Sequence, residues 1–222
     1  MVKKVDFLDL LKNSNTTFDF ETKAVKSGDL KKILEAGRFS PSSQNSQPWK
    51  FIVVKNEKTI DQLMKSCVYG AFYKDPPLMI AVVLEPLEKK FAGLAKSGFK
   101  NLLDYHRHLD ISLPVMNMYL ETNSLGLNGC IVSPEINVAN KILKVSKNSE
   151  AILLLGIGHK KKGSYTKNKE RRALKDIVFY EKYGGKKWLL LDWKGRLLNF
   201  WNLRGYVFVL LRLETTMKLT KK

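Results

Sequence analysis

The side chains best suited to bind a ligand lie in one polar segment, Arg38 to Pro48, just before Trp49. The segment is rich in Ser, Asn, Gln and Pro, which do not pack well in an apolar core, so it is predicted to be a loop. Its hydroxyls and amides both donate and accept hydrogen bonds, which favours a flat, heteroatom-rich ligand over an ion. An ordinary polar connection is the simpler alternative, and composition alone favours it.

Two apolar elements flank this loop and must position it. Before it, residues 30–37 keep apolar side chains at helical spacing, and Ser27 or Asp29 is expected to cap that helix. After it, Phe51 to Val54 is a compact apolar run, and Leu78 to Leu84 is another. Both runs are predicted to be strands buried on both faces of a sheet.

Helical and extended patterns alternate through most of the remaining chain. The expected helices are Val5 to Leu11, Ile60 to Val68, Asp110 to Leu125 and Asn137 to Leu143, and the further strands are Gly129 to Val132 and Ala151 to Ile157. Asp110 is expected to cap the long helix that follows it. Leu87 to Leu109 is Lys-rich and aromatic, and it is expected to be helical and to cover a site as a lid.

The loop in its context resembles a known family. Asp29 to Val54, which contains Arg-Phe-Ser-Pro-Ser-Ser-Gln-Asn-Ser-Gln-Pro-Trp, is similar to the first helix, flavin loop and first strand of the nitroreductase family. The similarity continues in Asp110 to Cys130, Ala151 to Gly158 and Lys169 to Val178, and it extends from about Phe20 to Gly184. That family consists of FMN-dependent NAD(P)H oxidoreductases that work as homodimers.

The resemblance implies an α+β, three-layer fold in which a mixed, mainly antiparallel sheet is flanked by helices. It also implies a homodimer formed through the long central helix, with each FMN at the interface between the chains. The flavin carries the hydride chemistry in such an enzyme, so no catalytic side chain and no metal are expected. The expected reaction is NAD(P)H-dependent reduction of a small organic acceptor of the nitroaromatic, quinone or enone type.

The resemblance also implies which residues would hold the flavin. The loop residues expected against the ribityl chain or ring edge of FMN are Ser42, Ser43 and Asn45, with Gln47 nearby. Arg172 would reach the phosphate as a planar two-pronged donor, with Arg171 and Lys169 as further cations. Backbone amides from Cys130 to Ser133 would face flavin N5.

The N-terminal segment departs from the family pattern. The family opens with Arg-x-Ser-x-Arg/Lys two residues before an aromatic, and these cations grip the phosphate. Aligned on Phe20, this chain has Ser14, Asn15, Thr16 and Phe18 instead. Thr16 still offers one hydroxyl, but each missing charge-assisted hydrogen bond would contribute about 1.5–3 kcal/mol. The alternative function is therefore a degenerate relative with weak or no flavin binding, acting as a membrane-associated accessory or binding protein.

Positive charge is concentrated near the end of the chain. Residues 160–222 hold 18 Lys or Arg against 5 Asp or Glu, so they carry +13 of the formal net charge of +18. This gradient places any basic partner surface in the last quarter. The expected division is a flavin domain, residues 1–185, and a basic amphipathic C-terminal extension, residues 186–222.

Three interpretations of the extension stay open. The favoured one is a helical arm that packs across the dimer partner. The second is peripheral membrane contact through residues 186–213, with Trp side chains at headgroup depth and cations facing anionic lipid. Nucleic-acid binding is least favoured, because the aromatics lie on an apolar face and no zinc-finger or RNA-recognition signature is present.

Cysteine usage and the first residues bear on the compartment. Cys67 and Cys130 lie in apolar surroundings, so both thiols are expected to be buried and inert, as is typical of a reducing compartment. No apolar signal-peptide core follows Met1. A cytoplasmic protein is therefore expected, with the inner face of the membrane as an alternative location.

Overall fold

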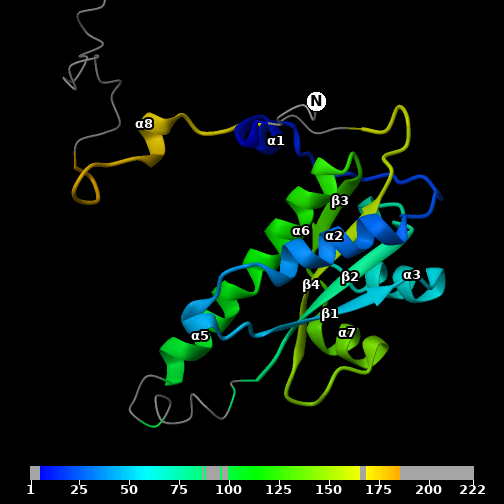
Figure 1. Ribbon diagram of the computed structural model, residues 1–222, viewed down its shortest axis with the longest axis horizontal. Coiled ribbons are helices and arrows are strands. Elements are labelled where there is room, and N and C mark those ends of the chain that lie inside the picture. The colour runs from blue at the N-terminus through cyan, green and yellow to red at the C-terminus, as the bar shows by residue number, and fades with distance from the viewer. Residues whose placement is uncertain (1–5, 87, 89–95, 97–99, 166–168, 186–222) are drawn as a thin grey trace, which may run out of the picture. The chain divides into compact units, whose positions relative to one another are not determined.

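The structure is a computed structural model of the 222-residue chain, and it describes residues 6–86, 88, 96, 100–165 and 169–185 (Figure 1). Contacts divide the chain into two units, residues 1–168 and 169–222. Every described strand belongs to the first unit, and the second contributes the short helix α8 (Leu174–Ile177). The expected extension from residue 186 onward lies outside the described residues, so its boundary stays a prediction.

Helices and strands alternate along the first unit. In chain order they are α1 (Phe7–Asn13), α2 (Ser27–Arg38), the 3-10 helix η1 (Ser43–Asn45), β1 (Trp49–Val54), α3 (Glu57–Lys65), the 3-10 helix η2 (Gly70–Phe72), β2 (Leu78–Leu84), α5 (Lys100–Asp110), α6 (Ser112–Ser124), β3 (Asn128–Val132), α7 (Ile136–Leu143) and β4 (Glu150–Gly158). The expected elements are confirmed, with shifted ends. Of the expected lid region, residues 100–109 are helical and belong to α5, while 87, 89–95 and 97–99 lie outside the described residues. No helix in the described ranges is long and apolar enough to cross a membrane.

The four strands form one sheet in the order β1-β2-β4-β3, and all neighbouring pairs are antiparallel. Thr16 adds a parallel bridge to Gly129 in β3, so the sheet is mixed but mainly antiparallel, as expected. All residues of β2 are buried. The expectation that Phe51 to Val54 is buried on both faces is wrong: β1 lies at an edge of the described sheet, where helices cover it only in part, and Val53 is exposed.

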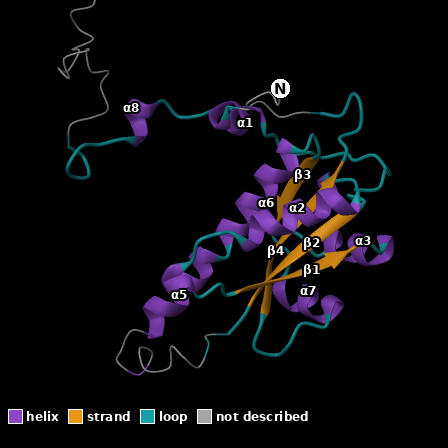
Figure 2. Ribbon diagram, in the orientation of Figure 1, coloured by secondary structure: helices purple, strands orange, loops and turns teal. Residues whose placement is uncertain are grey.

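Helices cover both faces of the sheet, which gives three layers (Figure 2). Alternate residues of β2, beginning with Leu78, pack with Ile33 of α2 and Met118 of α6. The residues between them pack with Leu63 of α3 and Ala139 of α7. This alternation follows from the two-residue period of a strand, and it confirms the expected α+β, three-layer fold.

Helices α2 and α6 approach each other closely at Gly37. A Cβ atom at this position would lie 2.9 Å from Cγ of Met118 and 3.0 Å from Cζ of Phe51. Just beyond it, Nδ2 of Asn117 in α6 donates to Oγ of Ser40 at 2.8 Å. The bare backbone at Gly37 therefore lets the end of α2 rest on α6, and the polar loop leaves α2 from a fixed point.

Two expected helix caps are wrong. Helix α2 begins after Lys26, which makes no side-chain capping bond, and both Ser27 and Asp29 lie inside its first turn. Asp110 does not cap α6; it ends α5, and its carboxylate binds a residue of the polar loop instead. By contrast, Glu135 caps the start of α7, because its carboxylate accepts hydrogen bonds from two amides of the first turn.

Candidate functional site

The polar loop that connects α2 to β1 is a tight turn. It contains η1, and the following Trp49 is buried. Three of its residues have positive φ, namely Gln44 (54°), Asn45 (53°) and Gln47 (45°). Because this left-handed conformation costs roughly 1–2 kcal/mol per residue for most L side chains, other interactions must hold the loop in shape.

Some of these interactions lie within the loop. The amide of Gln47 donates to Oγ of Ser42 at 2.9 Å, and Nε2 of Gln47 donates to Oδ1 of Asn45 at 3.0 Å. The amide of Asn45 also donates to the carbonyl oxygen of Ser42 at 3.0 Å. Three of the four loop residues predicted to bind FMN are thus hydrogen-bonded to one another. These bonds fix their side chains before a small molecule binds.

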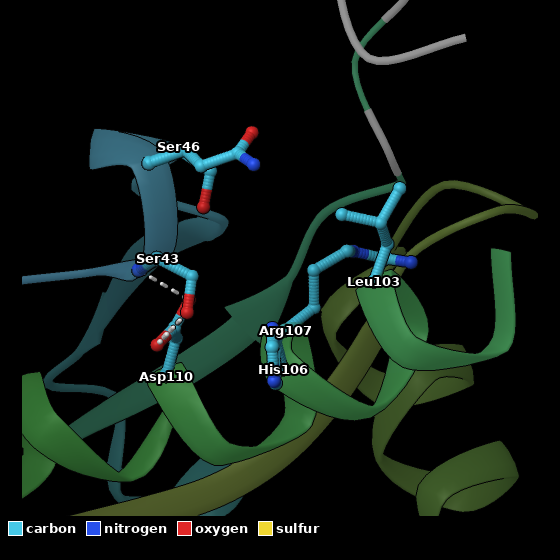
Figure 3. A pocket seen from close by; sticks show the side chains of 7 residues that line it. Ser43, Ser46, Leu103, His106, Arg107 and Asp110 are labelled. Carbon is cyan, nitrogen blue, oxygen red and sulfur yellow. Dashed lines mark hydrogen bonds between the residues drawn. The ribbon is translucent and has the colours of Figure 1, made fainter. Parts of the chain in front are cut away.

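The fourth, Ser43, is held from outside the loop by Asp110. Its amide donates to Oδ2 of Asp110 at 2.9 Å, and its Oγ donates to Oδ1 at 3.2 Å (Figure 3). Asp110 is only 6% exposed. A buried carboxylate accepts hydrogen bonds and donates none, so the two donors of Ser43 match it.

A hollow of about 220 Å³ lies between the loop and α5 (Figure 3). The residues that line it are Ser43, Gln44, Ser46, Leu103, His106, Arg107 and Asp110. Figure 3 shows Ser46 on the loop side and Leu103 on α5, across the hollow. Hydroxyl, amide and imidazole groups beside an aliphatic wall are typical of sites for small organic molecules.

Arg107 fastens α5 to the end of β2. Its Nη1 donates to Oδ1 of Asp104 at 2.8 Å, and its Nη2 donates to the carbonyl oxygen of Glu85. Its Nε is buried and has no hydrogen-bond partner among the described residues. Asp104 lies on α5 itself, so the bond to Glu85 is the one that links the helix carrying Asp110 to the end of β2.

The two N-terminal positions that lack the expected cations have structural roles. Ser14 is buried, and its Oγ donates to the carbonyl oxygen of Leu10 at the end of α1 at 2.7 Å. The ring of Phe18 stacks on Tyr73 with centroids 4.9 Å apart. Thr16 between them is exposed beside β3. Thr16 therefore keeps the exposed hydroxyl expected of it. The side chains of Ser14 and Phe18, by contrast, are engaged in contacts within the protein.

Cys130 and Ser133 mark the middle of β3 and the residue after its end. Cys130 is fully buried, and burial raises the pKa of its thiol to about 12. Burial likewise raises the pKa of Cys67 to about 11, and both cysteines are free. The expected burial of both thiols is confirmed, so Cys130 can offer a ligand only its backbone, whereas Ser133 is exposed.

The structure brings the loop ligands together but separates them from Thr16 and Cys130. Trp49 after the loop pairs with Leu84, which pairs with Glu150 at the start of β4. Gly129 beside Thr16 pairs with Ile157 near the end of β4. At about 3.3 Å per residue, these positions are roughly 23 Å apart along the strand. Within one chain, the two groups lie toward opposite ends of the sheet.

Arg171 and Arg172 belong to the second unit. Both are exposed, and Nη1 of Arg171 donates to the carbonyl oxygen of Glu170 at 2.9 Å. Desolvation, and then the charge of Arg171, lower the pKa of Lys169. The two arginines precede α8, and their assignment to the FMN phosphate stays a prediction.

Sequence reasoning missed the contribution of α5. His106 and Asp110 are one helical turn apart and both line the hollow, a spacing that places side chains on one face. That spacing was the available signal, but Asp110 also fits the pattern of a helix cap. In the structure the Asp110 carboxylate binds Ser43, which is distant in sequence, and not the first turn of the following helix.

Comparison with known proteins gives a consistent result. A model described as the nitroreductase family matches residues 16–159. A relative from Methanothermobacter thermautotrophicus, named "Putative NADH dehydrogenase/NAD(P)H nitroreductase", is 29% identical over 126 residues, which cover 57% of this chain and 60% of that protein. A "Putative NAD(P)H nitroreductase" from Haemophilus influenzae is 46% identical over 57 residues, 26% of each chain. The chain thus matches less than two thirds of the length of these curated relatives.

Solved structures share the fold. A nitroreductase family protein from Streptococcus pneumoniae superposes with a TM-score of 0.66 at 24% identity, covering 80% of this chain and 100% of that one. An FMN-dependent nitroreductase from Clostridium difficile gives 0.63 at 20% identity, with 80% and 100% covered. At these identities the likeness concerns the fold.

Proposed function

Because the chain belongs to the nitroreductase family, we propose that it is an FMN-dependent oxidoreductase that uses NAD(P)H to reduce a small organic acceptor. The acceptor class we propose is nitroaromatic, quinone or enone. One observation carries the proposal most directly: the loop ligands are already held in a single arrangement by their mutual hydrogen bonds and by Asp110.

The chemistry of the loop fits FMN. Hydroxyl and amide groups both donate and accept, and the edge of a flavin ring and its ribityl chain carry groups of both kinds. Ser42 and Asn45 each use their side-chain oxygen as an acceptor within the loop, which leaves the hydroxyl proton and the amide N–H groups for a ligand. The phosphate, by contrast, has only Thr16 in the N-terminal segment, so Arg171 and Arg172 are the proposed cations.

Bound FMN would supply the electron transfer between nicotinamide and acceptor, so the protein needs no nucleophile. The chain's own residues bind and orient. Ser42, Ser43 and Asn45 would lie against the ribityl chain or ring edge, with Gln47 nearby, and backbone amides near Cys130 would face the flavin from another element. The thiol of Cys130, kept protonated by burial, would take no part.

We propose that the working form is a homodimer. The loop and Thr16 are too far apart along β4 to reach the same part of one small ligand from a single chain. An exposed apolar stripe follows α5 and α6 at helical spacing: Leu102, Tyr105, Leu109, Leu113 and Met116. A second copy covering this stripe would bury it and would bring the loop of one chain to the β3 side of the other.

The test is flavin binding followed by subunit mixing. Purified protein is titrated with FMN and followed by the visible spectrum, and NADH and NADPH oxidation is then measured with a panel of acceptors. Thr16→Ala and Ser42→Ala chains, each weakened on one side of the site, should recover activity when mixed, because a hybrid dimer contains one intact site. A protein that stays colourless in excess FMN would instead favour the flavin-poor alternative, for which Ser14 and Phe18 in place of cations are the supporting observation.

Two proposals concern the C-terminal extension, residues 186–222. It is proposed to pack across the partner as a helical arm, and peripheral membrane contact through residues 186–213 is the second proposal. Flotation of the full chain and of a chain ending at residue 185 with anionic vesicles separates them. Equal behaviour of the two chains would reject the membrane proposal.

A further inference from the structure

The polar loop needs an external support. Three consecutive or near-consecutive non-glycine residues, Gln44, Asn45 and Gln47, have left-handed backbone conformations. Such strain persists only where the surrounding structure over-determines it. The bonds from Gln47 to Ser42 and Asn45 close the loop on itself, but they do not fix it to the rest of the fold.

For residues 42–47 that support comes from Asp110. Among the described residues, the side-chain hydrogen bonds that join this segment to another element both end on the Asp110 carboxylate, while Asn117 of α6 holds Ser40 nearer the start of the loop. Both donors belong to Ser43, at the start of η1, so fixing Ser43 fixes the beginning of the strained turn. The other end is held where Trp49 enters β1.

Other roles for Asp110 do not account for its position. It makes no capping bond to α6, and no salt bridge joins it to another of the described residues. Its neighbour Arg107 is taken by Asp104 and Glu85. A carboxylate that is only 6% exposed is costly to bury unless it is hydrogen-bonded, and the donors of Ser43 provide those bonds.

We propose that Asp110 is a positioning residue for flavin binding: it holds Ser43, and through Ser43 the left-handed turn, in the conformation that meets the ring edge of FMN. This inference rests on the proposed function. It also explains why α5, which no family motif singles out here, is fastened by Arg107 to the end of β2.

The experiment compares Asp110→Ala and Asp110→Asn with Asp61→Asn in the full-length protein. Asp61 lies on α3 in the opposite layer and pairs with Lys65 at the surface, so its substitution removes the same charge away from the loop. Amide hydrogen exchange of the flavin-free protein and FMN titration are measured for each. Asp110→Ala is expected to speed exchange of the Ser43 amide at least tenfold and to weaken FMN binding by about 10- to 100-fold, the range for losing charge-assisted hydrogen bonds.

Asp110→Asn is expected to fall between wild type and Asp110→Ala, because one amide oxygen can still accept from Ser43. It also serves if the alanine variant fails to fold. Asp61→Asn should leave both readouts unchanged, and adding Ser43→Ala to Asp110→Ala should cause little further increase in exchange of the residue 43 amide, since that amide has already lost its acceptor.

The outcomes separate this inference from the proposed function. If wild type binds FMN and both Asp110 variants bind it equally well, the positioning role is overturned. If wild type binds no FMN, the proposed function fails, and the exchange data then decide alone whether Asp110 holds the loop. Unchanged protection of the Ser43 amide in Asp110→Ala overturns the inference in either case.

Discussion

Gly37 and Gly28 offer a matched test of how α2 is seated. Both lie in α2, and the same substitution by alanine adds one methyl group at each. At Gly28 the new Cβ would have nothing within 4 Å, whereas at Gly37 it would meet Met118 and Phe51 at about 3 Å. The two variants therefore gain the same helix propensity but differ in packing.

The expected magnitudes follow from these two terms. Replacing glycine by alanine in a helix contributes up to about 1 kcal/mol of stability, and Gly28→Ala should retain most of that gain. An extra methyl in a packed contact costs about 1–3 kcal/mol, so Gly37→Ala should lose about 1 kcal/mol net. For a chain of this size, 1 kcal/mol moves the unfolding midpoint by roughly 2–4 °C.

Thermal unfolding of the two variants and wild type, followed by circular dichroism at matched concentration, measures the difference. Gly28→Ala should unfold a few degrees above wild type and Gly37→Ala a few degrees below. Hydrogen exchange at Ser43 should also rise in Gly37→Ala alone, because α2 would be lifted from α6 at the point where the loop begins. Equal midpoints for the two variants would refute the close α2–α6 approach and with it this account of loop placement.

Three further predictions concern single positions. Gly70→Ala should lower the urea midpoint by the equivalent of about 3 kcal/mol or more, because its Cβ would lie 1.7 Å from the carbonyl oxygen of Met64; wild-type stability would contradict the tight turn after α3. Backbone hydrogen bonds from Val138 and Asn137 lower the pKa of Glu135, so Glu135→Ala should lower the unfolding midpoint at neutral pH, and the difference should vanish as pH falls through that lowered pKa; a difference independent of pH would refute the cap. Burial raises the pKa of Cys67 to about 11 and of Cys130 to about 12. The contribution of the two thiols to folding stability is therefore complete below about pH 8.5 and is lost as pH rises toward those values. Rapid iodoacetamide labelling of the native protein at pH 8 would count against their burial.

The order and type of elements could be predicted because each depends on a local pattern. β2 shows this most clearly: a strand whose residues are all apolar has to be covered on both faces, and it lies inside the sheet. The same pattern misled for Phe51 to Val54, because an apolar run does not reveal how many neighbours a strand has. Strand order depends on contacts between distant segments, and those are absent from a local reading.

The loop ligands could be predicted as a group, but not the residue that supports them. Ser42, Asn45 and Gln47 interact within six residues, a range over which composition is informative. The partner of Ser43 lies 67 positions away, where nothing in the local sequence distinguishes a carboxylate that begins a helix from one that reaches across the fold. The convergence of Thr16, Cys130 and Arg172 on the same flavin depends on a second chain and on the second unit, so it stays a prediction.

The edge position of β1 has a consequence for handling the protein. Among the described strands, β1 pairs only with β2, so one row of its backbone N–H and C=O groups lacks a strand partner. Such an edge can recruit a strand from another molecule, and nearby lysines discourage this by repulsion. Lys55 follows the last residue of β1, and Lys50 lies near its start, where it pairs with Glu85. Salt shortens the reach of that repulsion to about 3 Å at 1 M. Concentrated salt, a common choice for keeping a basic protein in solution, would therefore remove the barrier to fibre-like association at this strand.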